Sequence, residues 1–275
     1  MEKVNLKNNK AITLICSMLL VFMMSLAIGI NADAAQKQSV KLPIFSSTTS
    51  YDLDGDGSKD SLYISSTMYG GVVSINRGYY DESYIINWGK SIVAWETDFY
   101  LYTLSNGNRY IGAYATGEYD EQLVHVIYRY TPGSLVKSLD VDRSLTNSLR
   151  GMEYTSEQVK VSGNTITVKY DTGLTATARY KFNVKYKPSS NKLKPTDTKY
   201  KVTVTKSGSK SFKVLKKFKT YKKVGSKKVS YTTKVGEKLK VVKICPKSKN
   251  AYVLLKRTSG KTGWVNFKKL SSYLR

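Results

Sequence analysis

Hydrophobic and polar residues alternate with a period of two in the middle of the chain, which is the pattern of half-buried β-strands. Short segments rich in Gly, Asn and Thr, at residues 162–164 and 171–173, separate three alternating runs and predict turns. The apolar positions of the runs are Val159 and Val161, then Ile166 and Val168, then Ala176, Ala178, Tyr180, Phe182 and Val184. This pattern predicts an antiparallel β-meander.

The residues before the meander give a similar but less regular pattern. Runs rich in Val, Ile and Tyr at 71–75, 91–95, 99–102, 109–114 and 123–130 predict strands, with turns at 105–108 and 131–133. Shorter alternating pairs follow at 202–204, 239–241 and 253–255. We therefore expect an all-β protein. Its N-terminal part is expected to be an antiparallel sandwich or a partial propeller, and the strand spacing does not choose between them.

The first 34 residues have the pattern of a secretory signal peptide. Lys3, Lys7 and Lys10 precede an apolar run at 11–30, and Ala-Asp-Ala at 32–34 offers a cleavage site. The alternative is an uncleaved anchor, because about twenty apolar residues can span a bilayer. Cleavage leaves no further membrane span and a single cysteine, so the sequence predicts a secreted or cell-wall-associated bacterial protein without an internal disulfide.

Charge divides the chain into two parts. The 275 residues carry a formal net charge of +25, but residues 201–275 hold 23 basic residues and one acid, Glu237, or +22. Residues 36–200 hold 19 basic and 17 acidic residues, or +2. Two prolines and several small polar residues at 187–198 are typical of a linker. We expect a nearly neutral β domain at 36–186 and a basic domain at 199–275.

The segment Asp-Leu-Asp-Gly-Asp-Gly-Ser-Lys-Asp at 52–60 predicts a calcium site. Its aspartates occupy loop positions 1, 3, 5 and 9, and a glycine at position 6 permits a sharp turn. Calcium takes six to eight oxygen ligands, and without a cation the carboxylates repel one another. The expected ligands are Asp52, Asp54, Asp56 and Asp60, with the Ser58 carbonyl. A solvated acidic turn is the alternative.

This loop differs from an EF-hand, because position 12 is Tyr63 instead of a bidentate Glu and the next residues alternate like a strand. It resembles the Asp-x-Asp-Gly-Asp-Gly-x-x-Asp loop of integrin-type FG-GAP repeats, in which a β-hairpin carries the calcium ion. The resemblance implies that Asp52, Asp54, Asp56 and Asp60 are side-chain ligands. A structural role of the metal is expected, because no base, nucleophile or histidine cluster accompanies the loop.

The C-terminal part resembles bacterial SH3-type (SH3b) domains. The matching motifs are Gly-Glu-Lys-Leu-Lys-Val at 236–241, Tyr-Val at 252–253 and Gly-Lys-Thr-Gly-Trp-Val at 260–265. The resemblance implies a small SH3-like barrel that binds cell-wall components without catalysis. Its candidate ligand-binding residues are Tyr221, Tyr231, Tyr252, Tyr273, Lys261 and Trp264.

The charge of the basic part favours an anionic partner. With the export signal, it points to peptidoglycan or a teichoic-acid-like wall polymer, and not to nucleic acid. A lysine-coated surface without a specific ligand is the alternative.

No catalytic constellation accompanies these motifs. After cleavage the chain has one histidine, His125, and one cysteine, Cys245, and these lie in different expected domains. The sequence therefore predicts a non-enzyme without catalytic residues. The alternative is a cell-wall hydrolase or hydrolase regulator with its active surface in the N-terminal domain.

Overall fold

The computed structural model describes residues 38–78, 80–88, 93–119, 122–141, 143–145, 154–175, 178–204, 211–247, 250–270 and 273. The expected signal peptide at 1–34 lies outside this part. Strands dominate the described residues, so the expected all-β class is confirmed. Within the same ranges, no helix has the length and apolarity that a membrane crossing requires.

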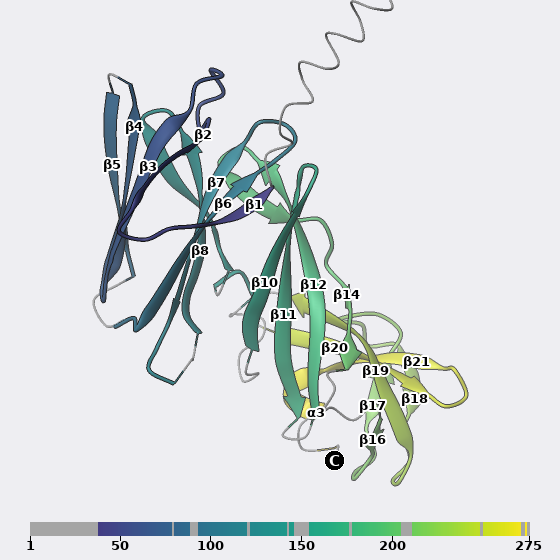
Figure 1. Cartoon of the computed structure of the whole chain (residues 1–275). Coiled ribbons are helices and arrows are strands. Elements are labelled where there is room, and N and C mark those ends of the chain that lie inside the picture. Colours follow the sequence, from purple (N-terminus) through teal and green to yellow (C-terminus); the bar gives the residue numbers. More distant parts are fainter. Residues whose placement is uncertain are drawn as a thin grey trace, which may run out of the picture. The chain divides into compact units, whose positions relative to one another are not determined.

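The described strands form four antiparallel sheets, which are coloured in chain order in Figure 1. The first sheet is the meander β2 (Ser47–Tyr51), β3 (Asp60–Thr67), β4 (Gly70–Arg77) and β5 (Tyr80–Asn87). The second sheet has the order β1 (Ser39–Leu42), β6 (Glu96–Thr103), β7 (Arg109–Thr116), β8 (Gln122–Thr131) and β9 (Ser134–Asp140).

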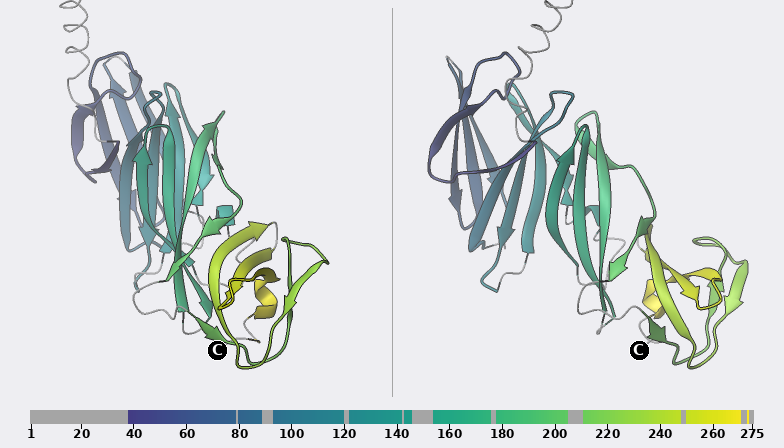
Figure 2. Two further views of the ribbon diagram at one scale, coloured as in Figure 1. Left: turned by 90° about the vertical axis from the view of Figure 1, so that its right-hand side faces the viewer. Right: turned by 45° about the vertical axis from the view of Figure 1, so that its right-hand side comes forward.

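The third and fourth sheets follow in the sequence. The third contains β10 (Tyr154–Ser162), β11 (Thr165–Thr175), β12 (Ala178–Ser189) and β13 (Lys192–Pro195), and β15 (Thr203–Val204) also pairs with β12. The fourth has the order β14 (Tyr200–Lys201), β19 (Lys238–Lys247), β20 (Asn250–Arg257), β21 (Thr262–Asn266), β17 (Lys219–Tyr221) and β18 (Val229–Thr232). The short strand β16 (Phe212–Lys213) pairs with β19, and the helical turn α3 (Phe267–Leu270) follows β21. Figure 2 shows β19–β21 from two further sides.

The second sheet is buried on both faces. Neighbouring residues of β6 belong to different cores: Leu101 packs with the first sheet, and Tyr102 packs in the cluster that continues into the third and fourth sheets. Alternate side chains of a strand point to opposite faces, so one strand contributes to both cores. Phe99 approaches the first sheet so closely that a Cβ on Gly71 would lie 2.5 Å from its ring.

Two strands extend into residues 187–198, the segment that was expected to be a linker. β12 continues to Ser189, turns at Ser190 (φ 55°) and returns as β13, which pairs with it from Lys192 to Pro195. The turn is held by the second sheet, because Arg129 donates to the Ser190 carbonyl at 2.9 Å. Leu193 is buried in the same cluster as residues before and after this segment. The composition suggested a boundary, but the core is continuous across it.

The expected strands are largely present, with two displaced boundaries. β11 continues through residues 171–173 to Thr175, where the sequence predicted a turn. Of the strand expected at 91–95, only residues 93–95 are described, and they lie outside the strands. Ala176 of the third apolar run lies outside the described residues.

His125 gives this fold a pH dependence. Its side chain in β8 is 5% exposed, and its ring meets Tyr114 edge to face with centroids 5.5 Å apart. Burial lowers the pKa of His125 to about 4. The unfolded chain takes up a proton near its ordinary pKa of about 6.5, whereas the folded chain does not. The free energy of unfolding is therefore expected to fall by about 3 kcal/mol as the pH decreases from 6.5 to 4. Below pH 4 the protonation of His125 is expected to cause no further change.

Urea unfolding of the protein and of His125→Gln across this pH range measures the effect. The variant is expected to lose this part of the pH dependence, whatever its stability at pH 7. Equal pH dependence in the two proteins would contradict the assignment.

Candidate functional site

The acidic segment forms the loop between β2 and β3. Two glycines allow its tight path, because Gly55 and Gly57 adopt left-handed backbone conformations with φ of 88° and 91°. Leu53 lies between two aspartates, yet its side chain is 3% exposed and belongs to the core beneath the first sheet. The loop is thus fixed to the core at its start, and Asp60 fixes its end as the first residue of β3.

Aspartate side chains organise the loop through hydrogen bonds from backbone amides. The Asp52 carboxylate accepts from Gly55 N at 2.6 Å and from Gly57 N at 3.2 Å. Asp54 and Asp56 each accept from the amide two residues ahead, at 3.1 and 2.7 Å. Aspartate favours such turns because its short side chain reaches the nearby backbone. These bonds preorganise the carboxylates without neutralising them.

Asp60 is the most deeply buried aspartate of the loop. Its side chain is 3% exposed, and Oδ2 accepts a 2.6 Å hydrogen bond from Leu53 N. Burial raises the pKa of Asp60, and the nearby carboxylates of Asp54, Asp52 and Asp56 raise it further, although the Leu53 amide opposes the shift. A cation beside this buried carboxylate would favour its ionised form.

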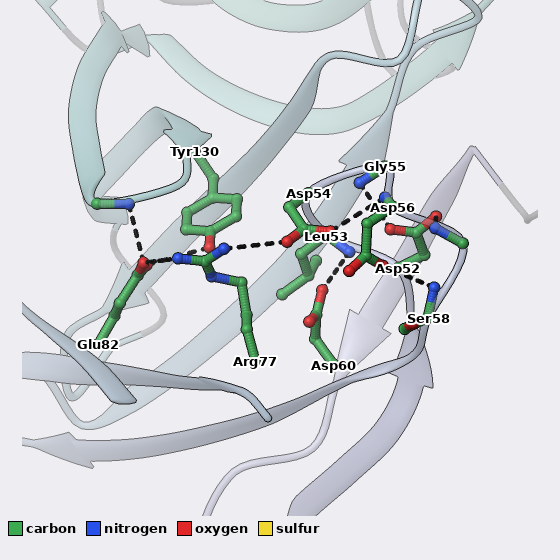
Figure 3. A network of polar contacts seen from close by, with 12 residues as sticks. Asp52, Leu53, Asp54, Gly55, Asp56, Ser58, Asp60, Arg77, Glu82 and Tyr130 are labelled. Carbon is green, nitrogen blue, oxygen red and sulfur yellow. Dashed lines mark hydrogen bonds and ion pairs between the residues drawn. The ribbon is translucent and has the colours of Figure 1, made fainter. Parts of the chain in front are cut away.

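Three of the predicted ligands converge (Figure 3). Carboxylate oxygens of Asp52, Asp54 and Asp60 all lie within 4.8 Å of one another. Carboxylate oxygens at this spacing could share one metal ion. Asp56 lies outside this group and is exposed, and the Ser58 amide binds Asp56.

Arg77 is a charged residue of this site that the sequence analysis missed. Its guanidinium lies between Asp54, at 3.0 Å, and Glu82, at 2.5 Å (Figure 3). The hydrogen bond from Arg77 lowers the pKa of Asp54, against the effect of burial. Both carboxylates in turn raise the pKa of Arg77. Arg77 is the last residue of β4 and Glu82 lies in β5. Their contact could be predicted from the sequence only if the register of this hairpin were known.

Glu82 continues the network into the second sheet. Its carboxylate accepts from Tyr130 OH at 3.1 Å and from Gly133 N at 2.9 Å, besides Tyr84 OH at 2.7 Å. A further link comes from Arg109 of β7, whose Nε donates to the Asp52 carbonyl at 3.2 Å. The acidic loop is therefore connected to both sheets that enclose its core.

A second candidate site is a groove on the fourth sheet. Its volume is about 480 Å³, and four of the six residues predicted as ligand-binding line it: Tyr221, Tyr252, Tyr273 and Trp264. The three tyrosines are half-buried, whereas Trp264 is 6% exposed and forms part of the base. Lys217, Lys219 and Lys223 also line the groove. An aromatic surface with several cations beside it can bind a ligand that has both apolar faces and negative charge.

Tyr231 and Lys261 do not line this groove. Tyr231 is 5% exposed, its ring lies 4.8 Å from the guanidinium carbon of Arg257, and burial raises its pKa to about 12. Lys261 is exposed in the turn between β20 and β21. Arg257 in turn holds Glu237, with an Nη2–Oε2 distance of 3.0 Å, so this acid of the basic part has a structural ion pair.

The closing Gly-Lys-Thr-Gly-Trp-Val motif has a steric reason for one of its glycines. A Cβ on Gly263 would overlap the Thr220 side chain and lie 3.1 Å from the Tyr231 ring. The glycine therefore lets β21 approach β17 and places Trp264 opposite Tyr221. This packing positions the base of the groove.

No known protein family, curated protein or solved structure matched the chain when it was compared with them.

Substitution of Asp60 tests the metal site. Calcium is expected to raise the melting temperature of the protein relative to EGTA, because a ligand that binds only the folded state stabilises it by about 2.7 kcal/mol at a hundredfold excess over Kd. Asp60→Asn is expected to lose most of this shift. In EGTA the variant is expected to be at least as stable as the unmodified protein, because it removes a buried charge that faces other carboxylates.

The matched control is Glu96→Gln, which removes one exposed acid at the start of β6. It is expected to keep the calcium response. A calcium response that survives in Asp60→Asn would contradict the site.

Proposed function

We propose that the chain is an exported, non-catalytic bacterial protein that the C-terminal basic part holds at the cell wall. The observation that carries this proposal is the groove on the fourth sheet, which combines Tyr221, Tyr252 and Tyr273 with three lysines. Its lining supports an anionic wall component as the partner, either peptidoglycan or a teichoic-acid-like polymer. Tyrosine faces suit sugar rings and peptide side chains, and lysines suit phosphate or carboxylate groups.

The fourth sheet is proposed to be a small SH3-like barrel. The order β19-β20-β21-β17-β18 and the close β17–β21 approach at Gly263 support this fold. The N-terminal part is proposed to be an antiparallel sandwich rather than a partial propeller. The shared core of the first and second sheets supports that choice, because a sandwich buries the facing sides of its two sheets.

The acidic loop is proposed to bind one calcium ion, with Asp52, Asp54 and Asp60 as side-chain ligands and with Asp56 and the Ser58 carbonyl as further candidates. Its role is structural. The ion would compensate the buried Asp60 charge, while Arg77 and Arg109 hold the loop against the two sheets. A ligand set fixed at both ends to a core is suited to stabilise a fold.

The environments of the two candidate catalytic side chains, His125 and Cys245, favour a binding protein without catalysis. His125 is 5% exposed and Cys245 is 4% exposed, and burial raises the pKa of the Cys245 thiol. A nucleophilic thiol needs access to its substrate and a lowered pKa, whereas the Cys245 thiol is buried and its pKa is raised. The buried histidine and cysteine are therefore assigned to the core.

Removal of two groove tyrosines tests wall binding. Purified wall sacculi are expected to retain the full-length mature protein, and Tyr221→Ala/Tyr252→Ala is expected to weaken retention about tenfold or more, because stacked aromatic residues dominate binding energies. Co-sedimentation at several salt concentrations measures the affinity. The matched control is Tyr69→Ala/Tyr119→Ala, which removes two exposed tyrosines from the N-terminal part.

Equal retention of both double variants would contradict the groove as the binding site. Clearing of a wall-containing gel by the protein would contradict the non-catalytic assignment and favour a hydrolase.

A further inference from the structure

The third sheet has a basic surface that is separate from the acidic loop and from the aromatic groove. The apolar side chains of β11 and β12 that face the core are Ile166, Val168, Phe182 and Val184. The residues that alternate with them along each strand therefore face outward. These outward positions include Lys160 on β10, Lys169 on β11 and Lys181 on β12. The sheet thus has one apolar face and one basic face.

Strand register places these three lysines on one diagonal. Lys160 lies opposite Thr167, two residues before Lys169 on β11. Lys169 lies opposite Asn183, two residues after Lys181 on β12. Diagonal neighbours in an antiparallel sheet are about 7–8 Å apart, so the row crosses three strands in nearly equal steps.

A hollow of about 460 Å³ lies over this row, and a fourth lysine, Lys201 of β14, also lines it. Thr167, Thr203 and Asn183 add hydroxyl and amide groups, which donate hydrogen bonds to anion oxygens. The Asp171 carboxylate is 3.6 Å from Lys181 Nζ and is buried, so it offsets part of one charge.

The lysine row has an electrostatic consequence. Four lysines line one hollow, so positive charge is concentrated there. A bound polyanion would be attracted to this charge and would release its own counterions. Lysines act as separate point charges, which suits phosphate groups, whereas arginine forks suit paired carboxylate oxygens.

From this geometry we infer that the hollow on the third sheet binds a linear phosphodiester polymer without bases, with successive phosphates along the lysine diagonal. Single-stranded nucleic acid is disfavoured, because binding to it uses exposed aromatic rings. Phe182 is the aromatic residue among the described lining residues, and it is 3% exposed. The inference goes beyond the proposed function, because it uses another sheet and other residues.

Calorimetric titration of the mature protein with sodium tripolyphosphate tests the site, in low salt and without calcium. Lys160→Gln/Lys201→Gln is expected to weaken binding at least fivefold, and these two exposed residues can be replaced without unpairing a buried acid. The matched control is Lys227→Gln/Lys228→Gln, which removes the same charge from the exposed loop between β17 and β18. The control is expected to change binding less than twofold.

Equal weakening in the two double variants, or no tripolyphosphate binding by the protein, would overturn the inference. Tyr221→Ala/Tyr252→Ala is expected to bind tripolyphosphate normally, so failure of the aromatic groove and failure of this site are distinguishable. The same calorimetry compares a polyglycerol phosphate chain with a thymidine oligonucleotide of equal charge and with phosphatidylglycerol vesicles. Tighter binding of the oligonucleotide or of the vesicles would overturn the assignment of a polymer without bases.

Discussion

The ionic chain from Asp54 through Arg77 to Glu82 connects the acidic loop with the two sheets around its core. Arg77 is the cation that allows acids from the loop and from β5 to lie close together. Glu82 then accepts hydrogen bonds from Tyr130 of β8 and from Gly133 in the turn between β8 and β9. Arg109 of β7 donates a hydrogen bond to the loop backbone. Because partly buried charges are costly unless paired, this chain favours one arrangement of the hairpin, the loop and the neighbouring sheet.

The same chain leaves a role for the proposed metal in the loop. Arg77 contacts Asp54 and does not contact the buried Asp60, whose pKa is raised. One arginine therefore compensates one end of the acidic cluster. The proposed calcium ion would compensate the other end, so that the two cations have different roles in one site.

Much of the β-structure was predictable because alternation of apolar and polar residues is local. The strands β10 and β11 and the turn between them follow directly from that pattern. The aspartate spacing likewise predicted a tight loop before β3. Pro188 and Pro195 suggested a linker, and in the structure both occupy paired positions near the edge of the third sheet.

The remaining features depend on contacts between distant residues. Tyr231 resembles the groove tyrosines in sequence, but its environment places it in the core beside Arg257. Arg77 could be assigned to the acidic site only from the register of β4 and β5. The lysine diagonal has the same origin, because residues 160, 169 and 181 align only when the pairing of three strands is known.

Anomalous diffraction from crystals grown in calcium shows whether the acidic loop binds the metal. One anomalous peak is expected, bounded by carboxylate oxygens of Asp52, Asp54 and Asp60, with Arg77 still bound to Asp54 and Glu82. A loop with no such peak at saturating calcium, or a peak located away from these three residues, would contradict this expectation.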